Sequence, residues 1–356
     1  MRLLVAPVSG GMFPNQLAMY NMLPSIPDII LASSGGNIAS YIALAADYNI
    51  HGMERILRCL NSSLLLKSWW PGILSFLPSI IAGFTRGSIY DSGIGFEPLF
   101  QTMFTPYTIS RKEIWTGTTN CNTSKCQLFC NLSEHESTLK LKNFTYDEFN
   151  IMPLRYLNRN ISDISAITLA SASIPSFVPP VTFNGAKYAD GGATYASPLT
   201  PMVPTLRYHH KLHIDYLSSF DVISTKPLIM KDMKDIIKST TQGMIHSMIL
   251  QDRSNGVELI RNGSGELNFI ESFCTANCLK QLYKFRNTTT RSLLELYPIN
   301  DNMIEMDNYV FEDANRILHL NEKHFRFRFW WLGDRDISDF KIWKHLSEDG
   351  CSVSSM

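Results

Sequence analysis

The sequence has no net charge, because 32 Lys and Arg residues balance 32 Asp and Glu residues. A chain without an overall positive field has no general attraction for nucleic-acid phosphates, so nucleic-acid binding is disfavoured as a function. Charged residues make up only 18% of the 356 residues and hydrophobic residues make up 45%. This composition excludes a disordered chain and is sufficient for a large globular core.

Cysteine is also scarce, and the seven cysteines are an odd number, so at least one is left without a partner in the chain. The N-terminus shows no basic region followed by a long apolar core and a cleavage site. We therefore expect a reduced, intracellular, cytoplasmic protein. Cys121, Cys126 and Cys130, with His135 nearby, lack the paired C-x₂-C spacing of zinc sites. This spacing favours an ordinary loop and no metal.

Long uninterrupted hydrophobic runs are absent. The most apolar stretch, residues 64–84, has the length of a membrane span but contains one charge, Lys67, and two prolines. These interruptions favour shorter, broken helices. The tryptophan pair beside the lysine is typical of a lipid–water boundary. Two interpretations remain open: an apolar flap with peripheral membrane contact, and a helical hairpin buried in the core.

A turn between a strand and a helix is predicted at residues 28–43. Ile29–Ala32 is a short apolar run typical of a buried parallel strand, and the residues after Gly36 favour a helix. The small residues between them resemble a G-x-S-x-G nucleophile elbow, in which a serine is held at the tip of a sharp turn. Ser34 is then the candidate nucleophile, with Ala32 in place of the first glycine. An ordinary strand–helix turn explains this stretch equally well.

A second strand–glycine–helix unit precedes the first. Residues 2–8 predict a strand and residues 15–23 a helix, with Gly10, Gly11 and Met12 between them. Loops at the carboxyl ends of neighbouring parallel strands converge on one rim of a sheet. The backbone N–H groups of this turn are therefore expected to face Ser34 as an oxyanion hole. A tight turn without a ligand is the alternative.

The third notable stretch is residues 170–198, where several prolines prevent a regular helix. Asn184-Gly185 is a strong hairpin signal between strands predicted at 181–183 and 187–189. The second strand ends in Asp190, followed by two glycines that let another loop approach its carboxylate closely. Without further context an ordinary turn aspartate is the simpler interpretation.

Elsewhere the chain gives only general signals, without repeats or long linkers, so a single domain over residues 1–356 is predicted. Three histidines, His209, His210 and His213, fall near a predicted loop. The remaining pattern predicts a helix at 38–60, strands near a sheet edge within 113–145, a helix ending at 172, helices at 230–262 and 276–298, and a strand at 324–333.

Taken together, these stretches resemble the patatin-like phospholipase family. The most specific part is Ala170-Ser-Ala-Ser-Ile-Pro175 followed by Tyr188-x-Asp190-Gly-Gly192, which is similar to the family's segment around its aspartate. The resemblance covers about residues 2–200. It implies an α/β fold: a three-layer α/β/α sandwich with a mainly parallel central sheet. Residues 1–200 are then the motif-bearing core, and residues 201–356 a mixed helical part with a few strands packed on it.

The resemblance also implies a lipid acyl hydrolase of the phospholipase A or lysophospholipase type. Ser34 is the expected nucleophile and Asp190 the general base, and the reaction needs no metal or organic cofactor. The expected oxyanion hole consists of N–H groups of Gly10, Gly11, Met12 and Gly35. A lipid is the expected partner, with membrane contact through residues 64–84, and the oligomeric state is not predicted.

The first glycine loop departs from the family pattern. Phe13 stands where a basic residue is usual, and Pro14 where the last glycine is usual. Three other functions therefore remain open. They are an acyltransferase on the same elbow, a catalytically weak or silent lipid-binding or scaffold protein, and a Ser-His-Asp hydrolase that takes its histidine from positions 209–213 or from His246.

Overall fold

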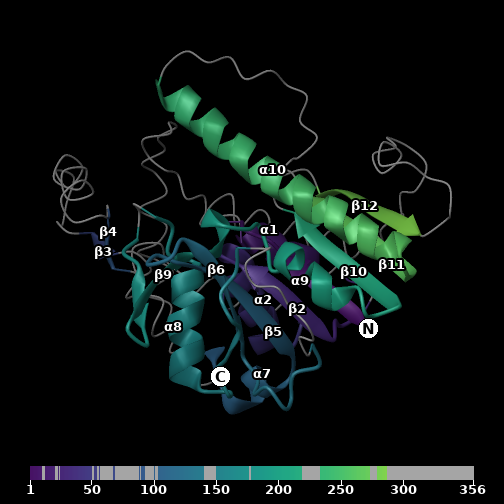
Figure 1. Cartoon of the computed structure of the whole chain (residues 1–356), viewed down its shortest axis with the longest axis horizontal. Coiled ribbons are helices and arrows are strands. Elements are labelled where there is room, and N and C mark those ends of the chain that lie inside the picture. Colours follow the sequence, from purple (N-terminus) through teal and green to yellow (C-terminus); the bar gives the residue numbers. More distant parts are fainter. Residues whose placement is uncertain are drawn as a thin grey trace.

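A mostly parallel sheet runs through the middle of the computed structural model (Figure 1). Along its main path the strands follow the order β12 (Leu279–Arg286), β11 (Ser264–Ser272), β10 (Lys211–Ser218), β1 (Arg2–Ala6), β2 (Ile29–Ser33), β5 (Glu113–Asn120), β6 (Lys125–Cys130) and β7 (Arg155–Tyr156). The structure describes residues 1–9, 13–20, 23, 25–49, 52–53, 56, 67–68, 88, 90–92, 100, 103–139, 150–175, 178–218, 233–272 and 279–286.

The centre of the sheet is formed by short apolar strands. β1 pairs in parallel with β2 on one side and with β10 on the other, and β2 pairs in parallel with β5. All five residues of β2 are buried. Continuous burial on both faces is what a central parallel strand requires, and it explains the uninterrupted apolar run of its sequence. The antiparallel pairs lie to either side, between β11 and β12 and between β5 and β6.

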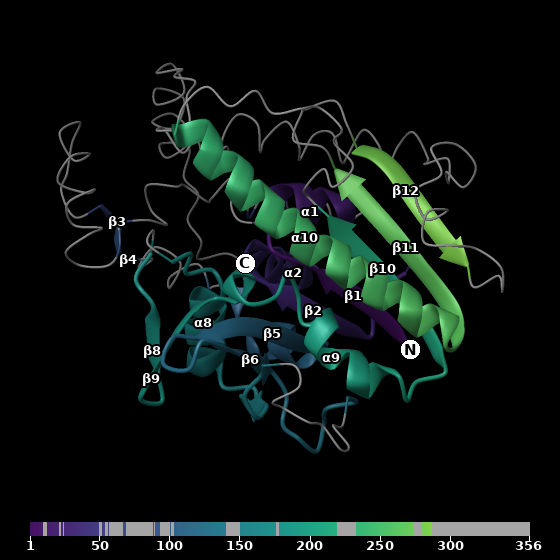
Figure 2. The same ribbon diagram turned by 45° about the horizontal axis from the view of Figure 1, so that its top comes forward.

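Helices cover both faces of this sheet, as the two views show (Figures 1 and 2). Two separate hydrophobic clusters, one on each face, hold the layers together. The first face carries α1 (Phe13–Tyr20), α2 (Gly35–Ala45), α7 (Pro106–Ser110) and α8 (Ile161–Ser171). The second face carries α9 (Leu199–Leu206) and α10 (Met233–Arg261). The predicted three-layer α/β/α arrangement is confirmed.

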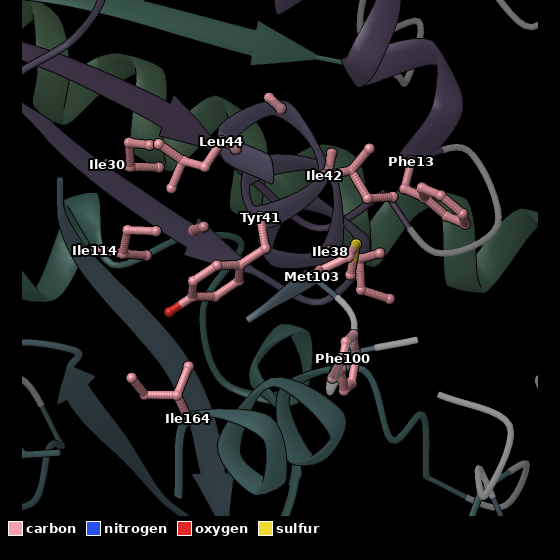
Figure 3. Close-up of a cluster of buried hydrophobic side chains, with 14 of the residues drawn as sticks. Phe13, Ile30, Ile38, Tyr41, Ile42, Leu44, Phe100, Met103, Ile114 and Ile164 are labelled. Carbon is pink, nitrogen blue, oxygen red and sulfur yellow. The ribbon is translucent and has the colours of Figure 1, made fainter. Parts of the chain in front are cut away.

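The first face is packed by α2 (Figure 3). Ile38, Tyr41 and Ile42 of this helix are almost completely buried. Tyr41 lies toward the sheet residues Ile30 and Ile114, and the two isoleucines of α2 lie toward Phe13 of α1. Burying a large apolar side chain contributes about 1.5–3 kcal/mol, so this face contributes strongly to the stability of the fold. The packing also fixes α2, whose first turn lies next to Ser34.

On the second face, a buried carboxylate links α10 to α9 and β10. Asp252 of α10 accepts hydrogen bonds from Ser197 Oγ at 2.5 Å, from Thr200 Oγ1, and from Tyr216 OH at 3.3 Å. These donors come from the start of α9 and from β10, so one side chain ties three elements together. Burial raises the pKa of Asp252 to about 6.

Several predicted elements need correction. The helix predicted for 38–60 ends at Ala45, where Asp47 and Tyr48 take positive φ angles of 54° and 57°. Residues 279–286 form strand β12 and not part of a helix at 276–298. Within 113–145, β6 lies next to the terminal strand β7, as predicted, whereas β5 lies further inside the sheet and pairs with β2, β6 and β9. A few strands were expected after residue 200, most without positions, and β10 and β11 are two of them; they extend the central sheet.

Other predictions fall on parts that are described sparsely. Of residues 64–84 the structure describes only Lys67–Ser68, a short strand, β3, paired with β4 (Tyr90–Ser92). The flap and membrane-contact interpretations, and the strand at 324–333, lie outside the described residues. The single-domain division of the chain stays a prediction. Within the part that is described, no helix has the length and hydropathy needed to cross a bilayer.

Candidate active site

Two strand ends meet beside β5. β2 pairs with β5 up to Ser33, which lies opposite Gly117. The strand β9 (Ala186–Asp190) comes from the other direction and ends with Asp190 opposite Thr118, the next residue of β5. β5 therefore changes partner between two consecutive residues. This change brings Ser34 and Asp190, 156 residues apart in sequence, into contact.

Ser34 lies on a sharp turn between β2 and α2. Its backbone has φ 56° and ψ −132°, a sparsely populated conformation for a residue with a side chain. Gly36 permits the turn, because a Cβ atom there would overlap the carbonyl oxygens of Ala6 and Pro7 in the neighbouring segment. The N–H of Asn37 donates to the Ser34 carbonyl at 3.0 Å and starts the helix. The predicted strand–turn–helix element is confirmed.

Asp190 is presented by a tight hairpin. β8 (Val181–Phe183) and β9 are joined by Asn184 and Gly185, with φ angles of 48° and 76°, as a type I′ turn requires. The hairpin predicted around these two residues is therefore confirmed. The N–H of Asp190 donates to the Ser173 carbonyl at 2.9 Å, and Thr119 Oγ1 donates to the Asp190 carbonyl at 2.8 Å. These bonds fix the backbone that carries the carboxylate.

The Asp190 carboxylate accepts two hydrogen bonds. Ser34 Oγ donates to Oδ2 at 2.5 Å, and the N–H of Gly192 donates to Oδ1 at 2.7 Å. Both side chains are buried, with exposed fractions of 3% for Ser34 and 5% for Asp190. Burial raises the pKa of Asp190 to about 6, against the opposing effect of these two hydrogen bonds. A carboxylate with this pKa is a stronger base than a solvated aspartate and remains ionised at neutral pH.

The predicted oxyanion hole is only partly described. Gly35 is the first residue of α2, and its N–H makes no hydrogen bond within the described part of the chain. A helix N-terminus with free N–H groups suits a developing negative charge. Gly10, Gly11 and Met12 lie outside the described residues, so their part in the site stays a prediction.

The residues that depart from the family pattern have structural roles. Phe13 begins α1 and is buried beside Ile38 and Ile42 in the first hydrophobic cluster (Figure 3). Its side chain thus belongs to the core. Pro14 is the second residue of α1, a position where the missing N–H of proline costs no helical hydrogen bond.

The histidine cluster lies far from Ser34. His213 pairs with Arg2 at the start of the parallel strands β10 and β1, and His209 and His210 directly precede β10. Ser34 follows the opposite, carboxyl end of β2. About five residues of strand, roughly 16 Å, separate the two edges. These three histidines therefore cannot contact Ser34 directly, whereas the side chain of His246 lies outside the described residues.

The cysteines and histidine considered for a metal site are not gathered together. Cys126 and Cys130 are buried on strand β6, which corrects the expectation of an ordinary loop, while Cys121 is exposed. Within the described residues, no group of three or more His, Cys, Asp or Glu side chains could hold a metal ion.

Three further residues belong to the site and were not predicted from the sequence: Gly117, Thr119 and Ser171. Ser171 Oγ accepts a hydrogen bond from the Ser34 N–H at 2.9 Å and donates one to the Gly117 carbonyl at 2.7 Å. An isolated glycine within a strand often marks a close backbone approach, and this was the available signal for Gly117. Ser171 belongs to the segment that resembles the family, but no local rule gives it a role.

Comparisons with known proteins bear on the family to which the chain belongs. No curated protein matches the chain significantly. The model of the family described as "Patatin-like phospholipase" matches residues 23–203, slightly more than half of the chain. The match contains both Ser34 and Asp190 and begins after the first glycine loop. The chain therefore belongs to the patatin-like phospholipase family, whose membership implies lipid acyl hydrolase activity.

Proposed function

We propose that this protein hydrolyses the acyl ester bond of a lipid, as a phospholipase A or lysophospholipase, through a Ser34–Asp190 dyad. The observation that carries the proposal is the buried hydrogen bond of 2.5 Å from Ser34 Oγ to Asp190 Oδ2. A nucleophile within hydrogen-bond reach of a base is the geometry that covalent catalysis requires. Family membership supports a lipid as the substrate class.

In the first half of the reaction Ser34 Oγ attacks the ester carbonyl carbon, and its proton passes to Asp190 Oδ2. The negative charge of the tetrahedral intermediate develops on the former carbonyl oxygen, where the N–H of Gly35 stabilises it together with N–H groups of the 10–12 loop. Asp190 then gives its proton to the departing alcohol oxygen. The products of this half are the free alcohol and an acyl-enzyme on Ser34.

In the second half water replaces the alcohol. Asp190 accepts a proton from the attacking water, and a second tetrahedral intermediate forms. Its collapse releases the fatty acid while Asp190 returns the proton to Ser34 Oγ, which restores the hydroxyl and the carboxylate. The strained backbone of Ser34 supports this assignment, because strain of this kind is concentrated at functional sites. The position of the histidines at the opposite edge of the sheet argues against a Ser-His-Asp triad that uses residues 209–213.

The proposal is tested with a fluorophosphonate, which forms a covalent bond with an activated serine. We expect labelling of the wild-type chain at Ser34, no labelling of Ser34→Ala, and at least a 100-fold slower reaction of Asp190→Asn. Ser197→Ala is the matched control, because Ser197 Oγ also donates to a buried aspartate, Asp252, at 2.5 Å. Unchanged labelling of Ser34→Ala would rule the proposal out.

The same preparation distinguishes the remaining functions. Release of fatty acid from phospholipid vesicles by the wild type, but not by Asp190→Asn, identifies a hydrolase. An increase in turnover when an alcohol acceptor is added identifies an acyltransferase. Lipid binding without acyl release, equal in both proteins, identifies a lipid-binding or scaffold protein. An intracellular location with peripheral membrane contact through residues 64–84 remains part of the proposal, and fractionation of cells tests it.

A further inference from the structure

The hydroxyl of Ser171 lies between two backbone groups of the active site. It accepts the hydrogen bond from the Ser34 N–H at 2.9 Å and donates to the Gly117 carbonyl at 2.7 Å. Ser171 is the last residue of α8, and its side chain is completely buried. Helix α8 therefore reaches the elbow through one side-chain oxygen.

The position of this hydroxyl follows from the way the sheet ends. The last pair of the β2–β5 ladder is Ser33 with Gly117. A parallel ladder continued by one residue would pair the N–H of Ser34 directly with the carbonyl of Gly117. The chain instead turns into α2 at Ser34, and the hydroxyl of Ser171 bridges the two groups. Buried backbone groups must find partners, so the turn depends on this bridge or a substitute for it.

The same segment also holds the second member of the dyad. Two residues after Ser171, the carbonyl of Ser173 accepts the hydrogen bond from the Asp190 N–H at 2.9 Å. The end of α8 is thus attached to the backbone of Ser34 through a side chain and to the backbone of Asp190 through the main chain. One short segment sets the position of the nucleophile relative to its base.

We propose that Ser171 is a positioning residue that holds Ser34 in its strained, reactive backbone conformation by bridging it to Gly117. This inference rests on the proposed hydrolase function for its kinetic consequences. Without the hydroxyl, the Ser34 N–H loses its acceptor, the backbone relaxes from φ 56°, and Oγ leaves its line of attack, while Asp190 keeps the hydrogen bond from the Gly192 N–H.

The kinetic test compares Ser171→Ala with a matched control from the same helix. Thr168 is equally buried, and its hydroxyl has no partner within the described residues, so Thr168→Val removes a hydroxyl without breaking a hydrogen bond. We expect Ser171→Ala to lower the rate constant for fluorophosphonate labelling, and kcat for a p-nitrophenyl ester, at least tenfold. KM should remain near wild type, and Thr168→Val should stay within about twofold.

Rates are expressed per folded molecule, so that a loss of stability alone does not count as support. If Ser171→Ala does not fold, Ser171→Cys replaces it, because a thiol is a weaker donor and acceptor at nearly the same size. The cysteine variant is expected to react more slowly than wild type. A wild-type rate in the folded variant, or equal slowing in Thr168→Val, overturns the proposal.

A second readout does not depend on catalysis. Amide hydrogen exchange, followed by mass spectrometry of peptides spanning residues 30–38, should be at least tenfold faster at Ser34 in Ser171→Ala than in wild type or Thr168→Val. Unchanged exchange shows that the bridge does not hold the elbow and overturns the inference. If wild type is not labelled by the fluorophosphonate, the proposed hydrolase function fails, and the exchange result alone decides whether the bridge exists.

Discussion

Ser33 and Asp190 are the last residues of two strands that run toward each other along the same edge of β5, where they pair with the consecutive residues Gly117 and Thr118. The two glycines nearby allow this approach. A Cβ atom at Gly117 would overlap Ser33 Oγ, and one at Gly191 would overlap the Gly117 carbonyl. The contact between the proposed nucleophile, Ser34, and the proposed base, Asp190, is therefore a consequence of strand pairing.

The first prediction concerns the pH dependence of the reaction. Asp190 accepts a proton only when it is ionised, and burial raises its pKa to about 6. We expect kcat/KM for an uncharged ester to rise with pH, to reach half of its maximum near pH 6 and to be constant above about pH 7. Measurement of hydrolysis between pH 4.5 and 9 checks this. Full activity at pH 4.5 would contradict the assignment of Asp190 as the base.

The second prediction concerns stability. The pKa of Asp190 is higher in the folded chain than the usual 3.8, so ionisation of this group opposes folding. Its contribution to stability is fully present below pH 4 and is lost as the pH rises through 6. Asp190→Asn, which cannot ionise, should therefore be more stable than wild type at pH 8, by about 2–3 kcal/mol, and not at pH 4.

Urea unfolding at the two pH values measures this difference. Glu134→Gln is the control, because Glu134 is exposed and the same loss of charge should change the free energy of unfolding by less than about 0.5 kcal/mol. A destabilised Asp190→Asn at pH 8 would show that the carboxylate stabilises the fold, contrary to its burial.

The third prediction uses two glycines. Gly36→Ala places a Cβ atom against the carbonyls of Ala6 and Pro7, which belong to backbone and cannot move aside, so we expect destabilisation by at least about 2 kcal/mol. Gly243 lies in helix α10, and a Cβ atom added there would meet no described atom outside its own helix within 4 Å, so Gly243→Ala should stabilise by about 0.5–1 kcal/mol. Urea midpoints of the two variants should thus move in opposite directions, and a shared direction would contradict the packing at the elbow.

The fourth prediction concerns the histidines. His209, His210 and His213 lie at the amino ends of the parallel strands, whereas Ser34 follows a carboxyl end. Replacement of all three by glutamine should leave kcat/KM for a p-nitrophenyl ester within about threefold of wild type. A loss of more than 100-fold in a folded triple variant would require a histidine-dependent mechanism.

The parts of the site that sequence predicted are those built from local signals. The elbow and the hairpin each depend on a few adjacent residues that favour one backbone conformation. These are the small residues around Ser34 and the Asn184-Gly185 turn. Their meeting was inferred only from the family resemblance. A local sequence pattern cannot predict a contact between two residues that are 156 positions apart.

The incorrect predictions have a different origin. β5 contains Thr116, Thr118 and Thr119, and such polar residues favour a partly exposed strand near an edge. In the structure all three are buried, because their hydroxyls find partners at Asn37, the Gln127 carbonyl and the Asp190 carbonyl. Buried polar residues whose hydrogen-bond partners are distant in the sequence cannot be distinguished from surface residues by the sequence alone. Residues 279–286 likewise form strand β12 because they pair with β11, and the intrinsic secondary-structure propensity of these residues does not predict that pairing.

The long separation of the dyad has a consequence for synthesis of the chain. A ribosome delivers the elbow serine well before the aspartate, and domains begin to fold from the N-terminal side. A nascent chain that ends before residue 190 contains Ser34 but neither its base nor the strand that carries it. If the proposed mechanism holds, acyl transfer to Ser34 begins only after β9 has added to β5, so truncated or unfinished chains do not react with lipids.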